Sequence, residues 1–578
     1  MHTFINLIKL FLVELLIIFS VVIIINKFVG NTKTTIKADA EGYYDYLPSI
    51  FIHHDLVRLS APKDQNPQLY NRINNRPYND YEKFKVNKYP CGTAILQLPF
   101  FTYTLLFNAD LENNDMDGYQ YVFHRSIFFA ALTYLFLSLI FLKKILETYS
   151  IKTYIIILTQ VLVAQATLLI NYVNYDAGFS HVYSLFAITA FCYFTIQYFK
   201  THQIKYVLIT CVFLGLILLL RQINLLIILA IPFLAGSAEN LRTGTMLLFS
   251  QYKKLLIGLL LVIGVFSIQC ILWYLQTGHF FVYSYQGEGF DFTNPKFIDI
   301  LFSYKKGLFV YTPVLFICLS GLGLFLFKRN YYLFFTWLTF FVILTYILSS
   351  WHSWYYGASY GLRAYIDFYP LFFILLACFL NEASMLSKSI CVVLCLITIP
   401  VNIIQTYQYK ENILHWYEMD KNKYWKVFLE TDDAFRGILW QKEYDYDNYA
   451  LVKEIALGDI YTTKNTTNLV LKINSAEIPD FNNVRIVQAL AYDDFKTDNR
   501  SKLVLWIQDS TNNKNLYWND ANLLHFPERK FNDWQTGIYN YEFIIPNDET
   551  IKTIGFEVKT AEQGCDLKNM RLRFLKLR

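Results

Sequence analysis

The chain of 578 residues is 54% hydrophobic and 18% aromatic, and only 17% of its residues are charged. A soluble globular domain is roughly 45–50% apolar and about 25% charged, so this composition excludes an ordinary soluble enzyme and predicts a polytopic membrane protein with a sizeable soluble part. The net charge of +5 is small for this length, and no basic tract stands out, which argues against a nucleic-acid partner.

The first apolar run, Leu10–Ile25, predicts an uncleaved membrane anchor and first span. A signal peptide is the alternative, but this run is long for a signal peptide, and the small residues Ala38–Ala40 lie too far downstream for a cleavage site. Similar runs recur through residues 1–405 and predict about eleven transmembrane helices. These predicted spans lie near 10–28, 122–142, 154–171, 181–199, 206–220, 224–236, 255–275, 308–327, 331–348, 367–381 and 389–405.

The position of Gly92–Phe107 decides the topology. If this segment does not cross, Lys143 and Lys144 share one side with the other basic loops, and the acidic loop that follows Phe107 lies on the opposite side, as the positive-inside rule requires. The segment is therefore predicted to be an interfacial or re-entrant helix, which suits the proline at position 99. The N-terminus is then cytoplasmic, and the first long loop, near 30–120, is external.

Residues 406–578 are predicted to form an external soluble domain after the transmembrane domain of residues 1–405. Polar and apolar side chains alternate there in runs such as NLVLKI and KLVLWIQD, and turn signals such as STNNKN separate them. This pattern predicts an all-β domain of the sandwich or jelly-roll type. Among the nine cysteines only Cys91 and Cys565 lie in polar regions, which leaves a disulfide between them open, and no Cys or His spacing typical of a metal site appears.

Acidic and aromatic residues gather where the first span leaves the membrane, in the stretch IKADAEGYYDYLPSIFIHHD. Asp39 is either the N-cap of an amphipathic interfacial helix over Glu41–His53, or a carboxylate that takes a proton, its pKa raised by partial desolvation. Glu41 would orient substrate or help to hold a metal. Tyr44 is a candidate for contact with substrate, and Asp45 is predicted to be solvated.

Two further loops on the predicted external side carry polar candidates. Asp176 and His181, in NYVNYDAGFSHVYSL, form either an ordinary polar turn or a substrate-binding pair at the membrane level of Asp39. Arg221 interrupts the apolar run LGLILLLRQINLLIILA. An arginine at such depth faces a cavity or a partner, or else extends its head group to the interface, so Arg221 is either an anion-binding residue or an interfacial one.

Basic and aromatic residues also lie in the last two external loops. Lys305 and Lys306 form a basic pair at the external entry of a span, where the positive-inside rule disfavours them, and an exposed pair there predicts binding of a phosphate. The loop SSWHSWYYGASYGLRAYIDFYP contains Trp351, His352 and Arg363. Interfacial aromatic belts explain only part of this composition, and aromatic faces also stack on sugar rings.

With these features the chain resembles the integral-membrane glycosyltransferases of the multi-spanning GT-C class, such as protein mannosyltransferases and the aminoarabinose transferase that modifies lipid A. The resemblance covers about residues 1–405. It rests on the acids after the first span, on KYPCGTAILQLPFF and DGYQYVFHR in order along the first loop, on the arginine within a later hairpin, and on a closing β domain.

The resemblance implies a sugar donor on polyprenyl phosphate or diphosphate, a hydroxyl acceptor on a glycan, lipid or protein, and inversion of the anomeric centre. It matches Asp39 to the family's general base, with Glu41 displaced by one position from the family's Asp-Glu pair. It also matches Asp176 and Arg221 to an acid and a basic residue of later loops. Donor phosphate would be bound by Arg221, Lys305, Lys306 or Arg363. A divalent metal, which oligosaccharyl transferases of the wider class need, is not predicted.

Two other functions remain open from the residues alone. One is a flippase or polymerase for lipid-linked glycans, which would need charges through the depth of the bilayer. The other is a non-catalytic membrane protein that binds surface glycans. Frequent Lys, Asn and Ile, with only 23 glycines, indicate an AT-rich bacterial genome and therefore a bacterial inner membrane, with the C-terminal domain periplasmic.

Overall fold

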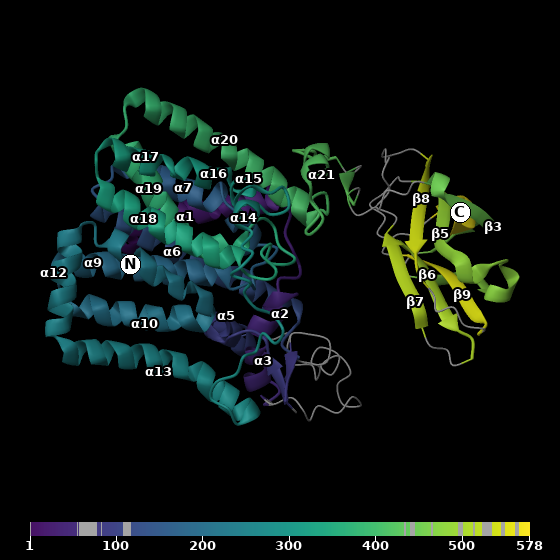
Figure 1. Ribbon diagram of the computed structural model, residues 1–578, viewed down its shortest axis with the longest axis horizontal. Coiled ribbons are helices and arrows are strands. Elements are labelled where there is room, and N and C mark those ends of the chain that lie inside the picture. The colour runs from purple at the N-terminus through teal and green to yellow at the C-terminus, as the bar shows by residue number, and fades with distance from the viewer. Residues whose placement is uncertain are drawn as a thin grey trace. The chain divides into compact units, whose positions relative to one another are not determined.

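The computed structural model describes residues 2–54, 56, 78–82, 84–107, 117–432, 435–437, 439, 446–463, 466–494, 501–511, 515–522, 534–544, 550–560 and 566–578. The chain separates into two compact units, Met1–Tyr407 and Gln408–Arg578. The first unit is helical and the second is built mainly of strands (Figure 1). Cys565 and most of the predicted acidic loop lie outside the described residues.

The helical unit contains seven described helices that are long and apolar enough to cross a membrane: Phe11–Val29, Tyr121–Thr148, His181–Thr201, Tyr252–Thr277, Tyr331–Ser349, Arg363–Glu382 and Met385–Lys410. These confirm the helical membrane class and coincide with seven of the predicted spans. In chain order the elements are α1 (His2–Ile24), η1 (Ile25–Val29), α2 (Asp39–Tyr44), α3 (Tyr46–Phe51), β1 (Tyr78–Tyr81), β2 (Phe84–Asn87), α5 (Gly92–Phe107), α6 (Tyr121–Thr148), α7 (Thr153–Gln165), α8 (Leu169–Val173), α9 (His181–Thr201), α10 (Ile204–Leu220), η3 (Gln222–Ala230), α11 (Ile231–Leu234), α12 (Ala238–Ser250), α13 (Tyr252–Thr277), α14 (Phe297–Phe302), α15 (Leu308–Tyr311), α16 (Pro313–Cys318), α17 (Ser320–Phe327), α18 (Tyr331–Ser349), η4 (Arg363–Phe368), α19 (Tyr369–Glu382) and α20 (Met385–Lys410).

The other four predicted spans are helical but short or broken. The run 154–171 is divided between α7 and α8, and 206–220 forms the 17-residue α10. The run 224–236 is largely 3-10 helix, and together with α11 it makes an angle of 115° with α12. Gly236 lies at this bend with a positive φ of 79°. The run 308–327 breaks into α15, α16 and α17, with Pro313 opening α16.

Helices α9, α10 and α13 lie side by side and differ in how much of their surface is buried (Figure 1). Helix α9 is almost wholly enclosed by other elements, whereas α13 leaves most of its apolar side chains exposed. A helix that is apolar all round and unburied by protein is what a lipid-facing span requires. The exposed apolar surface of α13 therefore supports membrane insertion.

The predicted interfacial helix over 41–53 is wrong in form. The chain instead makes two short helices, α2 and α3, and all side chains from Tyr43 to Ser49 are buried. Asp45, predicted to be solvated, is 3% exposed, and its Oδ1 accepts a 2.6 Å hydrogen bond from the Tyr119 hydroxyl. The hydroxyls of Tyr44 and Tyr46 also donate to the carbonyls of Gly118 and Tyr89, so this stretch packs into the protein rather than onto a lipid surface.

The second unit contains two four-stranded antiparallel sheets, with strand orders β3-β10-β5-β8 and β4-β9-β6-β7, which confirms the predicted all-β domain. The run KLVLWIQD is β6. The elements of this unit are α21 (Lys421–Lys426), η7 (Tyr446–Asn448), β3 (Tyr449–Tyr461), β4 (Thr467–Asn474), η8 (Ser475–Glu477), η9 (Phe481–Asn483), β5 (Val484–Asp494), β6 (Lys502–Asp509), β7 (Asn515–Asn522), β8 (Trp534–Glu542), β9 (Lys552–Lys559) and β10 (Asp566–Leu577).

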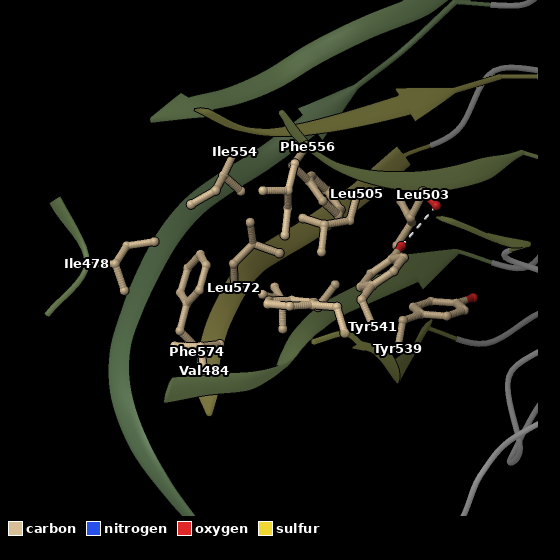
Figure 2. Packing of buried hydrophobic residues seen from close by; sticks show 14 of the residues in the cluster. Ile478, Val484, Leu503, Leu505, Tyr539, Tyr541, Ile554, Phe556, Leu572 and Phe574 are labelled. Atoms are coloured by element: carbon tan, nitrogen blue, oxygen red, sulfur yellow. Dashed lines mark hydrogen bonds between the residues drawn. The ribbon is translucent and has the colours of Figure 1, made fainter. Parts of the chain in front are cut away.

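Alternate side chains of both sheets form one buried apolar core. Leu505 and Phe556 from one sheet belong to the same cluster as Leu572 from the other (Figure 2). The hydroxyl of Tyr541 donates a 2.9 Å hydrogen bond to the carbonyl of Leu503, drawn as the dashed line in Figure 2. This bond satisfies a polar group that would otherwise be costly to bury.

We expect Leu505→Ala to lower the free energy of unfolding of this unit by about 2–5 kcal/mol, because the fully buried side chain leaves a cavity. The matched change Leu469→Ala removes a side chain that is 53% exposed and should alter stability by less than about 0.5 kcal/mol. Pulse proteolysis of the full chain in urea measures both. Equal effects of the two substitutions would contradict the assignment of Leu505 to the core.

Candidate functional site

The connection between the first span and α2 is held firmly before it reaches Asp39. Backbone N–H groups of Thr35 and Ile36 donate to Nδ1 of His124, at 3.1 and 3.0 Å. Ala38 then adopts a φ of 50° and a ψ of −127°, a conformation that costs a non-glycine residue roughly 1–3 kcal/mol. The N-cap of α2 is Ala38, and Asp39 follows as the first helical residue, so the predicted N-cap role of Asp39 is wrong. Its carboxylate instead contacts Tyr89 and Arg363.

The carboxylate of Asp39 has two partners. Its Oδ1 accepts a 2.7 Å hydrogen bond from the Tyr89 hydroxyl, and its Oδ2 lies 2.7 Å from Nη1 of Arg363. Burial opposes ionisation, but the Arg363 guanidinium and the Tyr89 hydroxyl outweigh it and hold the pKa of Asp39 below its ordinary value of 3.8. The predicted rise of this pKa is therefore wrong, and the carboxylate is ionised at neutral pH.

Arg363 opens η4, and Asp367 lies four residues further along the same short helix. The Asp367 carboxylate is fully buried and has two hydrogen-bond partners and one further cationic neighbour. His181 Nδ1 lies 2.9 Å from Oδ1, Asn224 Nδ2 donates to Oδ2 at 2.7 Å, and Arg221 Nε lies 3.7 Å from Oδ2. A buried carboxylate needs such partners, because an unpaired one would carry a large desolvation penalty.

The ring of His181 is neutral and contacts both Arg221 and Asp367. Arg221 Nη1 approaches His181 Nε2 at 3.0 Å, and an arginine nitrogen only donates. Nε2 is therefore the acceptor and Nδ1 carries the proton that is given to Asp367, an assignment made from the hydrogen-bond network. His181 and Arg221, both predicted as site residues, thus meet on a carboxylate that the sequence did not single out.

Tyr43 and Tyr285 connect the two ion pairs. Charges on both Arg221 and Asp39 act on the Tyr43 hydroxyl and on the Tyr285 hydroxyl, and burial is the main reason that the pKa of each is raised. The ring of Tyr43 lies 4.6 Å from that of Tyr89. Because Arg363 and Asp367 lie four residues apart on η4, and both phenols lie within reach of the charges of Asp39 and Arg221, the pairs Asp39–Arg363 and Asp367–Arg221 belong to one site.

Asp176 lies behind this site rather than within it. Its carboxylate is 3% exposed and accepts a 2.7 Å hydrogen bond from Asn171 Nδ2. Burial raises the pKa of Asp176 above its ordinary value, against the opposing charges of Lys37 and Arg363. The loop reaches the strained turn through Gly178, where a Cβ would come within 2.5 Å of the Ala40 Cβ. Asp176 is therefore a buried acid whose loop packs against the residues that precede Asp39.

The predicted lysine pair is not an exposed phosphate site. Lys306 is only 2% exposed, and its ammonium donates to the carbonyl and the hydroxyl of Ser359. Burial lowers the pKa of Lys306 well below its ordinary value. Lys305 is half-buried, with Nζ 4.1 Å from the centre of the Tyr355 ring. The prediction of an exposed pair rests on the membrane topology alone. Topology gives no information on the Ser359 carbonyl that accepts a hydrogen bond from Lys306.

The remaining predicted residues lie at different depths. Tyr44 is fully buried, with its hydroxyl donating to the Gly118 carbonyl, and so has no access to substrate. Trp351 stacks edge-on against Tyr285 at 6.0 Å, which joins it to the site. His352 is exposed beside Trp351, and Glu41 is half-buried in α2. No group of three or more His, Cys, Asp or Glu side chains suited to a metal occurs in the part of the chain that the structure describes.

Sequence reasoning missed Tyr89, Asp367 and Asn224. Tyr89 precedes a proline and Asn224 sits in an apolar run, so neither has a local pattern that marks it. Asp367 had a weak signal, because RAYID places an acid four residues after Arg363 within an otherwise aromatic stretch. A carboxylate inside a predicted span is costly and needs a partner, and this rule alone would have singled out Asp367.

No protein-family model matches the chain, and comparison with curated proteins returns no match. Among solved structures, the chain is similar to the apo crystal structure of the Archaeoglobus fulgidus oligosaccharyltransferase, with a TM-score of 0.42 and 12% identity over 75% of this chain and 59% of that chain. It is also similar to the oligosaccharyltransferase AglB of the same organism in complex with an inhibitory peptide and a dolichol-phosphate, with a TM-score of 0.41 and 12% identity over 72% and 57%. The chain thus spans about three fifths of the length of these structures.

We expect Asp367→Asn to lower the free energy of unfolding of the helical unit by about 3–5 kcal/mol, because it leaves Arg221 without its buried counter-charge. The control Glu382→Gln removes a carboxylate that pairs with Lys328 but is 46% exposed, and should change stability by less than about 1 kcal/mol. Thermal unfolding of the full chain in detergent compares the two. A similar small effect at both positions would contradict the paired state of Asp367.

Proposed function

We propose that the chain is a membrane glycosyltransferase that moves a sugar from a polyprenyl phosphate or diphosphate donor to a hydroxyl acceptor. The observation that carries this proposal is the pairing of Asp39 with Arg363 and Tyr89, beside a second arginine held by Asp367. The site thereby offers an ionised carboxylate and two guanidinium groups at the end of the first span. Such a set suits a reaction that removes a proton from a hydroxyl and releases a phosphate.

Asp39 acts in this proposal as the general base. Each carboxylate oxygen has a further lone pair beyond the one used by Tyr89 or Arg363, so an acceptor hydroxyl can still donate to it. The side chain of Asp39 is 26% exposed, more than Arg363 at 12%, which leaves it open to an acceptor. Because its lowered pKa makes it a weak base, proton transfer would come late, as the new bond to carbon forms.

The two arginines are assigned to the donor phosphate. Arg221 is 15% exposed and Arg363 12% exposed, and the buried Nε of Arg363 has no hydrogen-bond partner among the described residues. Guanidinium groups bind phosphate oxygens through paired, charge-assisted hydrogen bonds. Lys305 lies over the Tyr355 ring, whereas Lys306 is withdrawn from this role because its ammonium donates to Ser359.

The proposed reaction is a single displacement. The acceptor oxygen attacks the anomeric carbon as its proton passes to Asp39. The bond from that carbon to the phosphate oxygen breaks, and the oxygen leaves with the electron pair, its charge received by Arg221 and Arg363. Attack opposite the leaving group inverts the anomeric centre. Donor phosphate that draws Arg363 away from Asp39 would also raise the pKa of Asp39, so a bound donor would strengthen the base.

We propose that the reaction takes place on the external face, with Trp351 and Tyr285 forming the aromatic wall that faces a sugar ring. Asp176 and His181 then serve as supports, the first through its charge and the second by holding Arg221. Glu41 remains assigned to orientation of the acceptor. The donor sugar would be a hexose or pentose, and the acceptor a glycan, lipid or protein.

We expect Asp39→Asn to slow transfer by about 10²–10⁴-fold, the usual contribution of a positioned general base. The assay supplies purified protein with a polyprenyl-phosphate or polyprenyl-diphosphate sugar and an acceptor, and reports product formation. Arg125→Gln is the control, since Arg125 is exposed at the start of α6 and should keep full activity. Undiminished transfer by Asp39→Asn removes Asp39 as base. Movement of lipid-linked sugar across vesicles without transfer would instead support a flippase.

The pH dependence of kcat/KM, which reports groups of the free enzyme, should follow the lowered pKa of Asp39. Since that pKa lies below 3.8, the ionised base is lost as the pH falls through this lower value, and the acidic limb from Asp39 should have its midpoint below 3.8. Tyr89→Phe removes a hydrogen bond that favours the carboxylate, so an acidic limb should move to higher pH. Tyr121→Phe, at an exposed ring, should leave the profile unchanged. An unmoved limb in Tyr89→Phe would separate Asp39 from proton transfer.

A further inference from the structure

Two tryptophans lie next to each other on the face of sheet β4-β9-β6-β7 that points away from the core. The strand register places Trp506 of β6 opposite Trp518 of β7 and opposite Gly555 of β9. Residues directly opposite each other in antiparallel strands point to the same face. The neighbours of Trp506 along β6, Leu505 and Ile507, belong to the core, so Trp506 and the Trp518 opposite it point outward.

The indole of Trp506 is held flat against the sheet. A Cβ at position 555 would lie 2.0 Å from its Cζ2 atom and 2.1 Å from its Cε2 atom, so only glycine leaves room for the ring. A glycine inside a strand often marks such a close approach. Trp506 Nε1 also donates a 2.8 Å hydrogen bond to Glu557 Oε1. The orientation of this ring is therefore fixed before any ligand binds.

Trp518 supplies an open ring beside it. Its side chain is 52% exposed, and Lys559 Nζ lies 5.6 Å from the ring centre. A tryptophan on a soluble surface usually buries more of its apolar area, and exposed apolar surface of this kind often serves binding. Two adjacent indoles, one fixed and one open, thus make a flat aromatic surface.

Ion pairs border this surface. Lys502 Nζ lies 2.6 Å from Asp520 Oδ2, and Lys559 Nζ lies 3.7 Å from Glu557 Oε2. On the other side of the indoles, Gln508 Nε2 donates to Asn515 Oδ1 at 2.7 Å. The exposed Lys472 of β4 lies opposite Gly555 and adds one positive charge to the two ion pairs. The border is therefore rich in hydrogen-bond donors and acceptors and offers a polyanion little excess positive charge.

We propose that this surface, the tryptophan platform of Trp506, Trp518, Asp520, Glu557 and Lys559, binds an uncharged glycan. A sugar ring has an apolar face of C–H groups and a rim of hydroxyls. The C–H face fits the indoles, and the hydroxyls fit the carboxylates and ammonium groups around them. This inference does not rest on the proposed transfer reaction, because the platform lies in the β unit and binding is measured without a donor.

The test measures binding of neutral hexasaccharides of glucose, mannose, galactose and N-acetylglucosamine to the full chain in detergent by calorimetry, with polygalacturonate as an anionic probe. We expect at least one neutral hexasaccharide to bind, and Trp518→Ala to weaken it by about ten-fold or more, as for an aromatic residue central to a site. The matched control is Tyr461→Ala, an aromatic 64% exposed on β3 of the other sheet, which should bind normally. Gly555→Ala, which displaces the fixed indole, should weaken binding while Trp518 remains.

Three results would overturn the proposal: no neutral hexasaccharide binds, only polygalacturonate binds, or Trp518→Ala binds as tightly as the unaltered chain. Thermal unfolding of Trp518→Ala verifies that its β unit is intact, and the exposed position makes this the expected outcome. Asp39→Asn provides the distinction from the reaction site. Normal glycan binding by Asp39→Asn supports the platform, and loss of binding in that variant places the glycan at the reaction site and refutes it.

Discussion

Burying a charge is costly, and the helical unit meets this cost by pairing its buried charges around one short helix, η4. Asp367 is completely enclosed, so its carboxylate must collect donors from several elements, and His181, Arg221 and Asn224 reach it from α9, the end of α10 and η3. Four elements are thereby held at one point. Arg363, on the same turn, then holds α2 through Asp39. The position of the candidate base Asp39 therefore depends on η4, and η4 is held in place through a second carboxylate, that of Asp367.

The two ion pairs differ in a way that suits different roles. Asp367 has no exposed surface, whereas the side chain of Asp39 is 26% exposed. Breaking an enclosed pair leaves an uncompensated charge with no access to water, so the inner pair is fixed. An outer pair with some solvent access can exchange one partner for a ligand at lower cost. A rigid inner pair beside an exchangeable outer pair would let the site keep its shape on binding the proposed donor phosphate.

Hydropathy and periodicity predicted the fold class and both kinds of unit, because the signals for spans and strands are local. These patterns did not predict the breaks in some spans. Residues 308–327 form three short helices, although their apolar composition is that of one continuous span. For the site, Asp39, Arg221 and Arg363 could be found because charge is conspicuous beside a membrane. Their partners could not, since the pairing depends on contacts such as His181 with Asp367, 186 residues apart. Lys306 shows the same limit, because nothing in its neighbourhood predicts the Ser359 carbonyl.

The wide separation of these partners has a consequence for biogenesis. Four of the seven described candidate spans lie between Asp39 and Arg363 along the chain. Asp39 and Arg221 therefore precede Arg363 and Asp367, with which they form ion pairs. Burying either charge before its partner has been made would carry a desolvation cost that the ion pair later offsets. Burial of these two residues thus becomes more favourable once the segment that contains η4 has been added.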